Sequence, residues 1–147
     1  MTMDNYLALE GLLIARLRDQ IPDIPSQGVK DLAGVKTLAL PNASLFVYLV
    51  GDHPGETADL GANQQIRQSW TVEVVVRNTF QAATGAGARQ EAGPLLAQVI
   101  RALSGWTPDF TIYRALYREK SEVRPGYSDD GFLFYPLQFA VNFVFTV

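Results

Sequence analysis

The 147-residue chain contains no cysteine and a single histidine, His53. Without cysteine there is no disulfide scaffold, no thiol nucleophile and no thiolate metal site. One histidine excludes a two-histidine metal motif within the chain, and no Gly-x-Ser-x-Gly motif is present for His53 to assist. These absences predict a protein that is not an enzyme and that requires no cofactor.

Charged residues are also scarce. They make up 18% of the sequence, against roughly 25% in a typical soluble domain, so we expect part of the surface to contact a partner. The net charge of −3 argues against a protein whose main role is to bind nucleic-acid phosphates. The longest uncharged segment, 131–147, is shorter than the roughly 20 residues of a membrane-spanning helix. No association with a membrane is therefore predicted.

The length indicates one domain over residues 1–147, because single domains are commonest at roughly 100–150 residues. Two amphipathic helices are predicted in it, over 4–21 and 89–103, where apolar residues recur at every third or fourth position. Pro94 is compatible with the second helix if it lies in the first turn, where its missing N–H has no intrahelical partner. Gly105 suits the left-handed position that follows the end of that helix.

Strands are predicted where β-branched and aromatic residues concentrate or alternate with polar ones. The clearest strand, 66–77, forms an antiparallel hairpin with a dense apolar strand at 44–50, and a long polar loop at 51–65 connects them. A long final strand is predicted at 132–147. Shorter strands are predicted at 35–40 and 112–118. Together these elements predict an α+β fold, a mostly antiparallel sheet of two hairpins with two helices packed on it.

Two groups of residues are candidates for binding. The first is in loop 51–65, which contains Asp52, His53, Glu56 and Asp59. A histidine and three carboxylates could bind a metal ion, but their spacing does not match a calcium loop, and a solvated acidic loop is favoured. We therefore predict that these residues contact a partner and that they bind no metal.

The second group combines cations with tyrosines in the region of the last two predicted strands. Its main members are Arg114, Arg118 and Tyr127, with Lys120 and Arg124 nearby. Such a mixture could bind single-stranded nucleic acid, form a protein interface, where Arg and Tyr are enriched, or be a solvated sheet face. We retain Arg114, Arg118 and Tyr127 as predicted partner-binding residues.

Several segments together resemble a known family. The N-terminal helix LALEGLLIARLRDQIP precedes the strands SLFVYLVG and QSWTVEVVVRN, and the helix EAGPLLAQVIRALSGWTP precedes the final strand YPLQFAVNFVF. The combination resembles the small tail-terminator and tail-completion proteins of long-tailed bacteriophages and related prophages. The resemblance covers nearly the whole chain, and its most distinctive parts are the Leu-Ser-Gly-Trp helix ending and the Tyr-Pro-Leu strand.

This resemblance implies a structural virion protein without catalytic chemistry. The subunit would form a ring, usually a homohexamer, that caps the tail tube and later meets the connector on the head side. Its partners would be further copies of the chain, the tail tube protein, the head–tail connector or stopper protein, and genomic DNA that passes through the channel without specific binding. The location would be the head-proximal end of the virion tail, after assembly in the bacterial host cytoplasm.

Two alternatives stay open beside this interpretation. One is a head–tail adaptor or completion protein of a neighbouring ring, and the other is a small-ligand-binding α+β module. If the chain forms a ring, acidic side chains at the DNA passage would repel phosphates and let the genome slide. The expected channel-lining residues are Asp52, Glu56 and Asp59, because they share one predicted loop.

Overall fold

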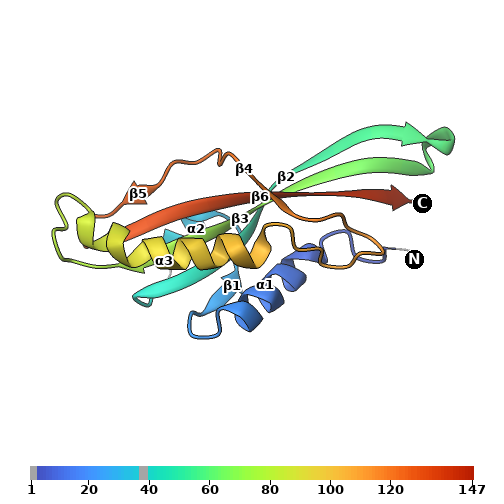
Figure 1. Ribbon diagram of the computed structural model, residues 1–147. Coiled ribbons are helices and arrows are strands. Elements are labelled where there is room, and N and C mark those ends of the chain that lie inside the picture. The colour runs from blue at the N-terminus through green and yellow to red at the C-terminus, as the bar shows by residue number, and fades with distance from the viewer. Residues whose placement is uncertain (1–2, 37–39) are drawn as a thin grey trace.

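The computed structural model describes residues 3–36 and 40–147. Within them the chain forms three α-helices, one 3-10 helix and a six-stranded sheet (Figure 1). The elements are α1 (Leu9–Gln20), β1 (Ser26–Gly28), α2 (Leu32–Lys36), β2 (Ala43–Ala58), η1 (Asp59–Gly61), β3 (Asn63–Arg77), α3 (Ala86–Leu103), β4 (Tyr117–Glu119), β5 (Gly126–Tyr127) and β6 (Phe132–Thr146). The predicted α+β fold with a mostly antiparallel sheet is confirmed. None of the described helices is long and apolar enough to cross a membrane.

Three long strands form the centre of the sheet. β2 pairs antiparallel with β3, and β3 pairs antiparallel with β6 along its whole length, from Asn63 opposite Thr146 to Arg77 opposite Phe132. The strand order is β1-β2-β3-β6-β4, with β5 also beside β6. β1 runs parallel to β2, so the sheet is mixed at this edge. The shared ladder makes an elongated molecule whose long axis follows these three strands (Figure 1).

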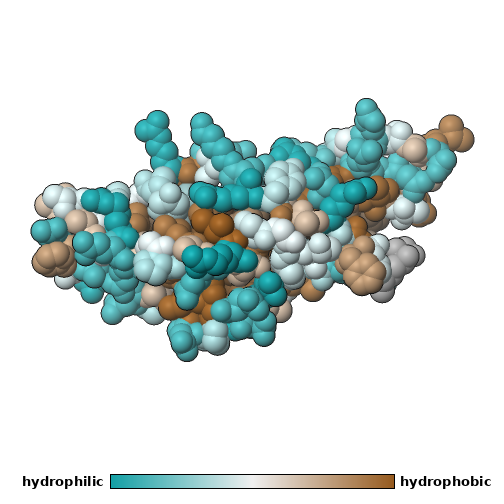
Figure 2. All heavy atoms as spheres, viewed as in Figure 1, coloured by the Kyte–Doolittle hydropathy of each residue, from teal (hydrophilic) through white to brown (hydrophobic). Residues whose placement is uncertain are grey.

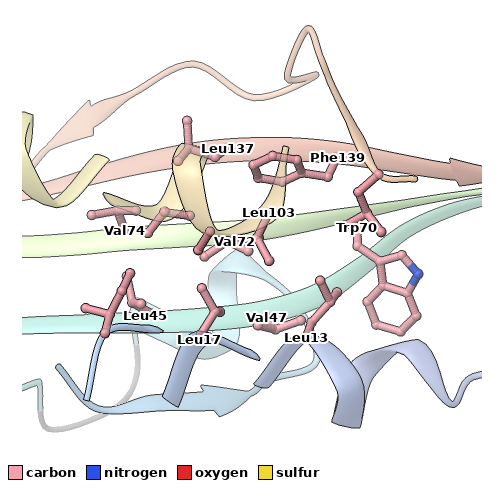
Figure 3. Packing of buried hydrophobic residues seen from close by; sticks show 14 of the residues in the cluster. Leu13, Leu17, Leu45, Val47, Trp70, Val72, Val74, Leu103, Leu137 and Phe139 are labelled. Carbon is pink, nitrogen blue, oxygen red and sulfur yellow. The ribbon is translucent and has the colours of Figure 1, made fainter. Parts of the chain in front are cut away.

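Helices α1 and α3 cover one face of the sheet, which we call the helical face. Successive side chains of a strand point to opposite faces, so alternate residues of β2, β3 and β6 meet the apolar sides of the helices. Leu13 and Leu17 of α1 and Leu103 of α3 are fully buried there, together with Val72 of β3 (Figure 3). The apolar periodicity that predicted both helices therefore identifies the main core.

The opposite face carries a second, smaller apolar cluster. Val35 of α2 packs with Phe46 of β2, Val75 of β3 and Phe134 of β6. At this end of the molecule the sheet is buried on both faces, which explains why consecutive residues of β3 are apolar. Val72, Val74 and Val76 of β3 pack in the main core, whereas Val75 packs in the second cluster.

The strand predicted at 35–40 is wrong at its start. Val35 and Lys36 are the last residues of α2, whose first turn is capped by Asp31, because Gly34 N donates a hydrogen bond of 2.7 Å to Asp31 Oδ1. Residues 37–39 of that prediction lie outside the described residues. A local capping bond thus outweighs the β-propensity of a short apolar segment.

The loop predicted at 51–65 is also wrong, because the β2–β3 hairpin continues through most of it. Gly51 lies opposite Ser69 and His53 opposite Arg67, and the register shifts on either side of this part of β2. β3 is held by β6 over the same stretch, so backbone pairing orders a segment whose polar side chains gave no strand signal. We call residues 51–62 the arm, since this hairpin end extends away from the helices (Figure 1).

The helix predicted at 89–103 begins earlier, at Ala86, so Pro94 lies in its interior rather than in its first turn. Pro94 therefore removes one hydrogen bond from the middle of α3. The residue before α3 is Gly85, whose φ of +71° favours glycine. A Cβ atom at this position would also overlap the Tyr127 ring. Gly105 adopts a φ of +78°, as predicted.

Most of the strand predicted at 112–118 does not form. Only Tyr117 and the two residues after it make β4, while Tyr113 forms an isolated bridge with Phe143. The reason lies in two other hydrogen bonds: Gly105 N donates to Leu116 O, and Leu116 N donates to Trp106 O. These bonds hold Leu116 to the end of α3, while the backbones of Tyr113 and Arg114 still contact β6.

Candidate interaction surfaces

The arm ends in a strained, exposed apolar residue. Asp59, Leu60 and Gly61 have φ values of 52°, 57° and 91°, the left-handed region that residues with a Cβ atom rarely adopt. Leu60 is fully exposed at this tip, and Figure 2 shows hydrophobic atoms at the far end of the arm. The Leu60 side chain buries no apolar surface within the subunit, which makes the tip a candidate contact point.

The predicted acidic cluster is dispersed along the arm, because strand alternation separates neighbours. Asp52 points to the helical face, where its Oδ1 accepts a hydrogen bond of 2.9 Å from Tyr6 Oη. His53 is the next residue, so it lies on the opposite face beside Arg67. Glu56 lies in the irregular stretch of β2, and Asp59 accepts a hydrogen bond from Asn63 Nδ2.

This dispersal has two consequences. No group of three or more potential metal ligands gathers anywhere in the described part of the chain. Burial and the contact with Asp52 raise the pKa of Tyr6 to about 12, so this tyrosine is a neutral hydrogen-bond donor at physiological pH. Asp52 is thereby tied to the body of the subunit, whereas Glu56 and Asp59 are exposed near the tip.

A polar network on the face of the sheet opposite to the helical face links β4 to β3 and β6. Glu119 accepts hydrogen bonds from Ser69 Oγ (2.6 Å), Gln138 Nε2 (2.7 Å) and Arg67 Nη1 (2.7 Å). Burial alone would raise the pKa of Glu119, but these three donors and the charge of Arg67 outweigh it and lower the pKa. The network is a structural attachment, and it explains why polar residues are buried in the middle of the sheet.

A second carboxylate on the same face, nearer to α2, is fully buried. Glu73 has 0% of its surface exposed, and one of its oxygens accepts a hydrogen bond of 2.8 Å from Tyr48 Oη. The other oxygen, Oε2, has no hydrogen-bond partner among the described residues. Burial raises the pKa of Glu73 to about 7, against smaller opposing effects of Tyr48 and Lys36. Glu73 was not among the predicted site residues, although a lone charge within a run of valines was its signal.

The second predicted group, Arg114, Arg118 and Tyr127, does not form one patch. Arg114 pairs through its backbone with Asn142, near the arm, whereas Tyr127 lies opposite Leu133 at the other end of β6. Leu133 and Asn142 are nine residue steps apart along β6, or about 30 Å. Arg118 lies between them in β4, and the Tyr127 hydroxyl accepts a hydrogen bond of 3.1 Å from Arg89.

Sequence reasoning missed a hollow of about 470 Å³ at the end of the sheet opposite to the arm. Its floor is aromatic, from Phe132 and Phe134, and it is bordered by two cations. Lys36 Nζ lies 5.2 Å from the Phe134 ring centre, and Arg77 Cζ lies 5.6 Å from that of Phe132. These residues come from three separate parts of the chain, so no local motif could reveal them. We call this the aromatic hollow.

Comparison with known proteins places the chain in a family. No curated protein matches it. Solved structures also match, and one of them is similar over 92% of this chain and 90% of its own length, with 18% sequence identity and a TM-score of 0.49. The sequence model of the phage tail terminator proteins matches residues 3–147. Because that match spans nearly all of the sequence, this chain belongs to the phage tail terminator protein family.

Proposed function

We propose that this protein caps the tail tube of a long-tailed phage as a homomeric ring and joins the tube to the connector on the head side. Family membership supports a structural protein of the phage tail that contacts other virion proteins. The proposal adds to this the ring, its six subunits and its position at the head-proximal end of the tail. Assembly would take place in the host cytoplasm before the tail meets the head.

The observation that carries this proposal is the distribution of surface features along the sheet. The subunit has an exposed, strained Leu60 at one end and an aromatic hollow at the other, both outside its main core. Complementary features at opposite ends of one molecule favour head-to-tail contacts, which generate a ring when the rotation between subunits closes. A ring with a central passage would suit a component through which DNA must pass without specific binding.

The direct test is to add the purified protein to growing tail tubes. If the protein caps the tube, substoichiometric amounts relative to tube subunits should stop elongation, and electron microscopy should show one ring at one end of each tube. Tubes that keep growing with the protein bound along their sides would contradict capping.

Labelling the protein in intact virions tests its layer. A label between the tube and the connector supports the terminator position. A label beyond the connector would indicate an adaptor or completion protein of the neighbouring ring, and no label in virions would point to the ligand-binding alternative.

A further inference from the structure

The arm carries an acidic charge around an apolar tip. No lysine or arginine occurs between Gly51 and Ile66, so Glu56 and Asp59 are not neutralised by a cation within the hairpin end itself. Both are exposed, and Leu60 stands beyond them at the tip. A surface that would fit this tip must offer an apolar recess with cations on its border.

The aromatic hollow offers two aromatic rings with a cation beside each, in a lining whose other members are mostly polar. Phe134 is almost fully buried and forms the floor, while Phe132 is partly exposed. Lys36 and Arg77 are both exposed, and each lies over one of these rings, so their charges border the recess. Asp130 also borders it, and Ser128 Oγ donates a hydrogen bond to that carboxylate. Arg77 Nε is engaged by the carbonyl oxygen of Asp130, which leaves its other nitrogens to face a ligand.

A subunit cannot place its own arm in its own hollow. β3 begins at Asn63 beside the arm tip and ends at Arg77 on the border of the hollow. The fourteen residue steps between them span about 45 Å of a strand that is paired on both sides. An arm that occupies the hollow must therefore come from another molecule, and the acidic arm of a second copy of this chain is complementary in charge to Lys36 and Arg77.

We infer that the arm of one subunit docks in the aromatic hollow of the next, with Leu60 against Phe132 and Phe134 and with Glu56 and Asp59 facing Lys36 and Arg77. The inference deepens the proposed ring by naming its contact. Because the contact joins opposite ends of identical subunits, repeating it builds a closed ring or an open chain. It also reassigns two of the predicted channel-lining residues, since Glu56 and Asp59 in this contact would not face the DNA.

Engineered cysteines test the contact directly, because the natural chain has none. Leu60→Cys would be combined with Asn42→Cys, an exposed position on the border of the hollow. Under mild oxidation this double variant should form disulfide-linked oligomers in most of the protein. The matched control pairs Leu60→Cys with Val123→Cys, an exposed residue that lies outside the hollow, and should stay mostly unlinked.

Charge exchange provides an independent readout. Glu56→Lys with Asp59→Lys should weaken self-association about tenfold or more, measured by analytical ultracentrifugation, and Lys36→Glu with Arg77→Glu should do the same. Mixing the two double variants should recover association, because every contact is an acid–base pair in an oligomer in which the two variants alternate. Circular dichroism would verify that each variant is folded.

The outcomes separate this inference from the proposed function. Rings that cap tubes but give no Leu60→Cys/Asn42→Cys link overturn the inference and leave the function standing. Linked oligomers that neither close nor stop tube growth support the contact and overturn the capping function. Subunits that stay monomeric and unlinked at every concentration, even in the presence of tube ends, overturn both.

Discussion

The two ends of the β2–β3 hairpin differ in burial. Every residue from Trp70 to Val76 is buried, because helices cover one face and α2 covers the other, whereas every residue of the arm from Asp52 to Gly61 is exposed. The same hairpin therefore contributes to the core at one end and extends away from it at the other. The difference indicates that the covered end provides stability and that the arm is available for contacts between molecules.

The sharpest test of this division is to remove a large side chain from each region. Leu17→Ala should lower the free energy of unfolding by about 2–5 kcal/mol, because Leu17 is fully buried between α1 and the sheet. Leu60→Ala at the arm tip should change it by less than about 0.5 kcal/mol. Urea unfolding followed by circular dichroism measures both. Equal losses for the two variants would show that the arm is part of the folding core.

The buried carboxylate of Glu73 should make the covered end sensitive to pH. Its pKa rises from the ordinary 4.5 to about 7 on folding, so the folded state holds a proton that the unfolded chain releases. The contribution of Glu73 to the free energy of unfolding should therefore be highest below about pH 4.5. It should fall as the pH rises towards about 7 and be constant above that.

Glu73→Gln mimics the protonated form and should remove that slope. The variant should be more stable than the natural chain at pH 8 by about 1–3 kcal/mol, given the 1.36 kcal/mol that corresponds to one pKa unit. Glu56→Gln, in the exposed arm, is the matched control and should leave the pH profile unchanged. A Glu73→Gln profile that keeps the natural slope between pH 4.5 and 7 would contradict the assignment.

Glu119 should show the opposite sign. Its pKa is lowered by the donors around it, so its contribution is present above the pKa of the unfolded chain and is lost as the pH falls through the folded value. Glu119→Gln should cost about 1 kcal/mol at pH 7, a modest figure because its partner Arg67 is partly exposed to solvent. Hydrogen exchange should accelerate in β4, while the β2–β3 amides of the covered end stay protected. Unchanged exchange in β4 would mean that the network does not hold this strand.

Sequence reasoning succeeded where periodicity reports burial and failed where order comes from distant partners. The apolar stripes containing Leu13, Leu17 and Leu103 predicted both main helices, and Gly105 marked the end of α3 correctly. The arm was predicted as a loop because its strand character depends on the backbone of β3, and not on its own side chains.

The candidate surfaces were harder to predict for the same reason. Asp52 and His53 are adjacent in sequence but point to opposite faces once the segment is a strand. The aromatic hollow joins Lys36, Arg77 and Phe132, which only the register of the sheet brings together. Glu73 was visible as a charge among valines, but its burial required the second apolar cluster under α2, which no sequence pattern indicated.

The smallest expected effect tests whether the strain at the arm tip serves assembly. Leu60 has a φ of +57°, and glycine adopts this region without the steric cost that a Cβ atom imposes. Leu60→Gly should therefore leave the subunit unchanged in stability or raise it by about 0.5–1 kcal/mol, while self-association weakens about tenfold because the apolar tip is lost. Leu60→Asn relieves the strain similarly and also lacks the apolar tip, so it should behave like the glycine variant. Leu60→Met keeps the tip and should associate as the natural chain does. If Leu60→Gly associates normally, the leucine has no role between subunits, and its conformation follows from the hairpin turn alone.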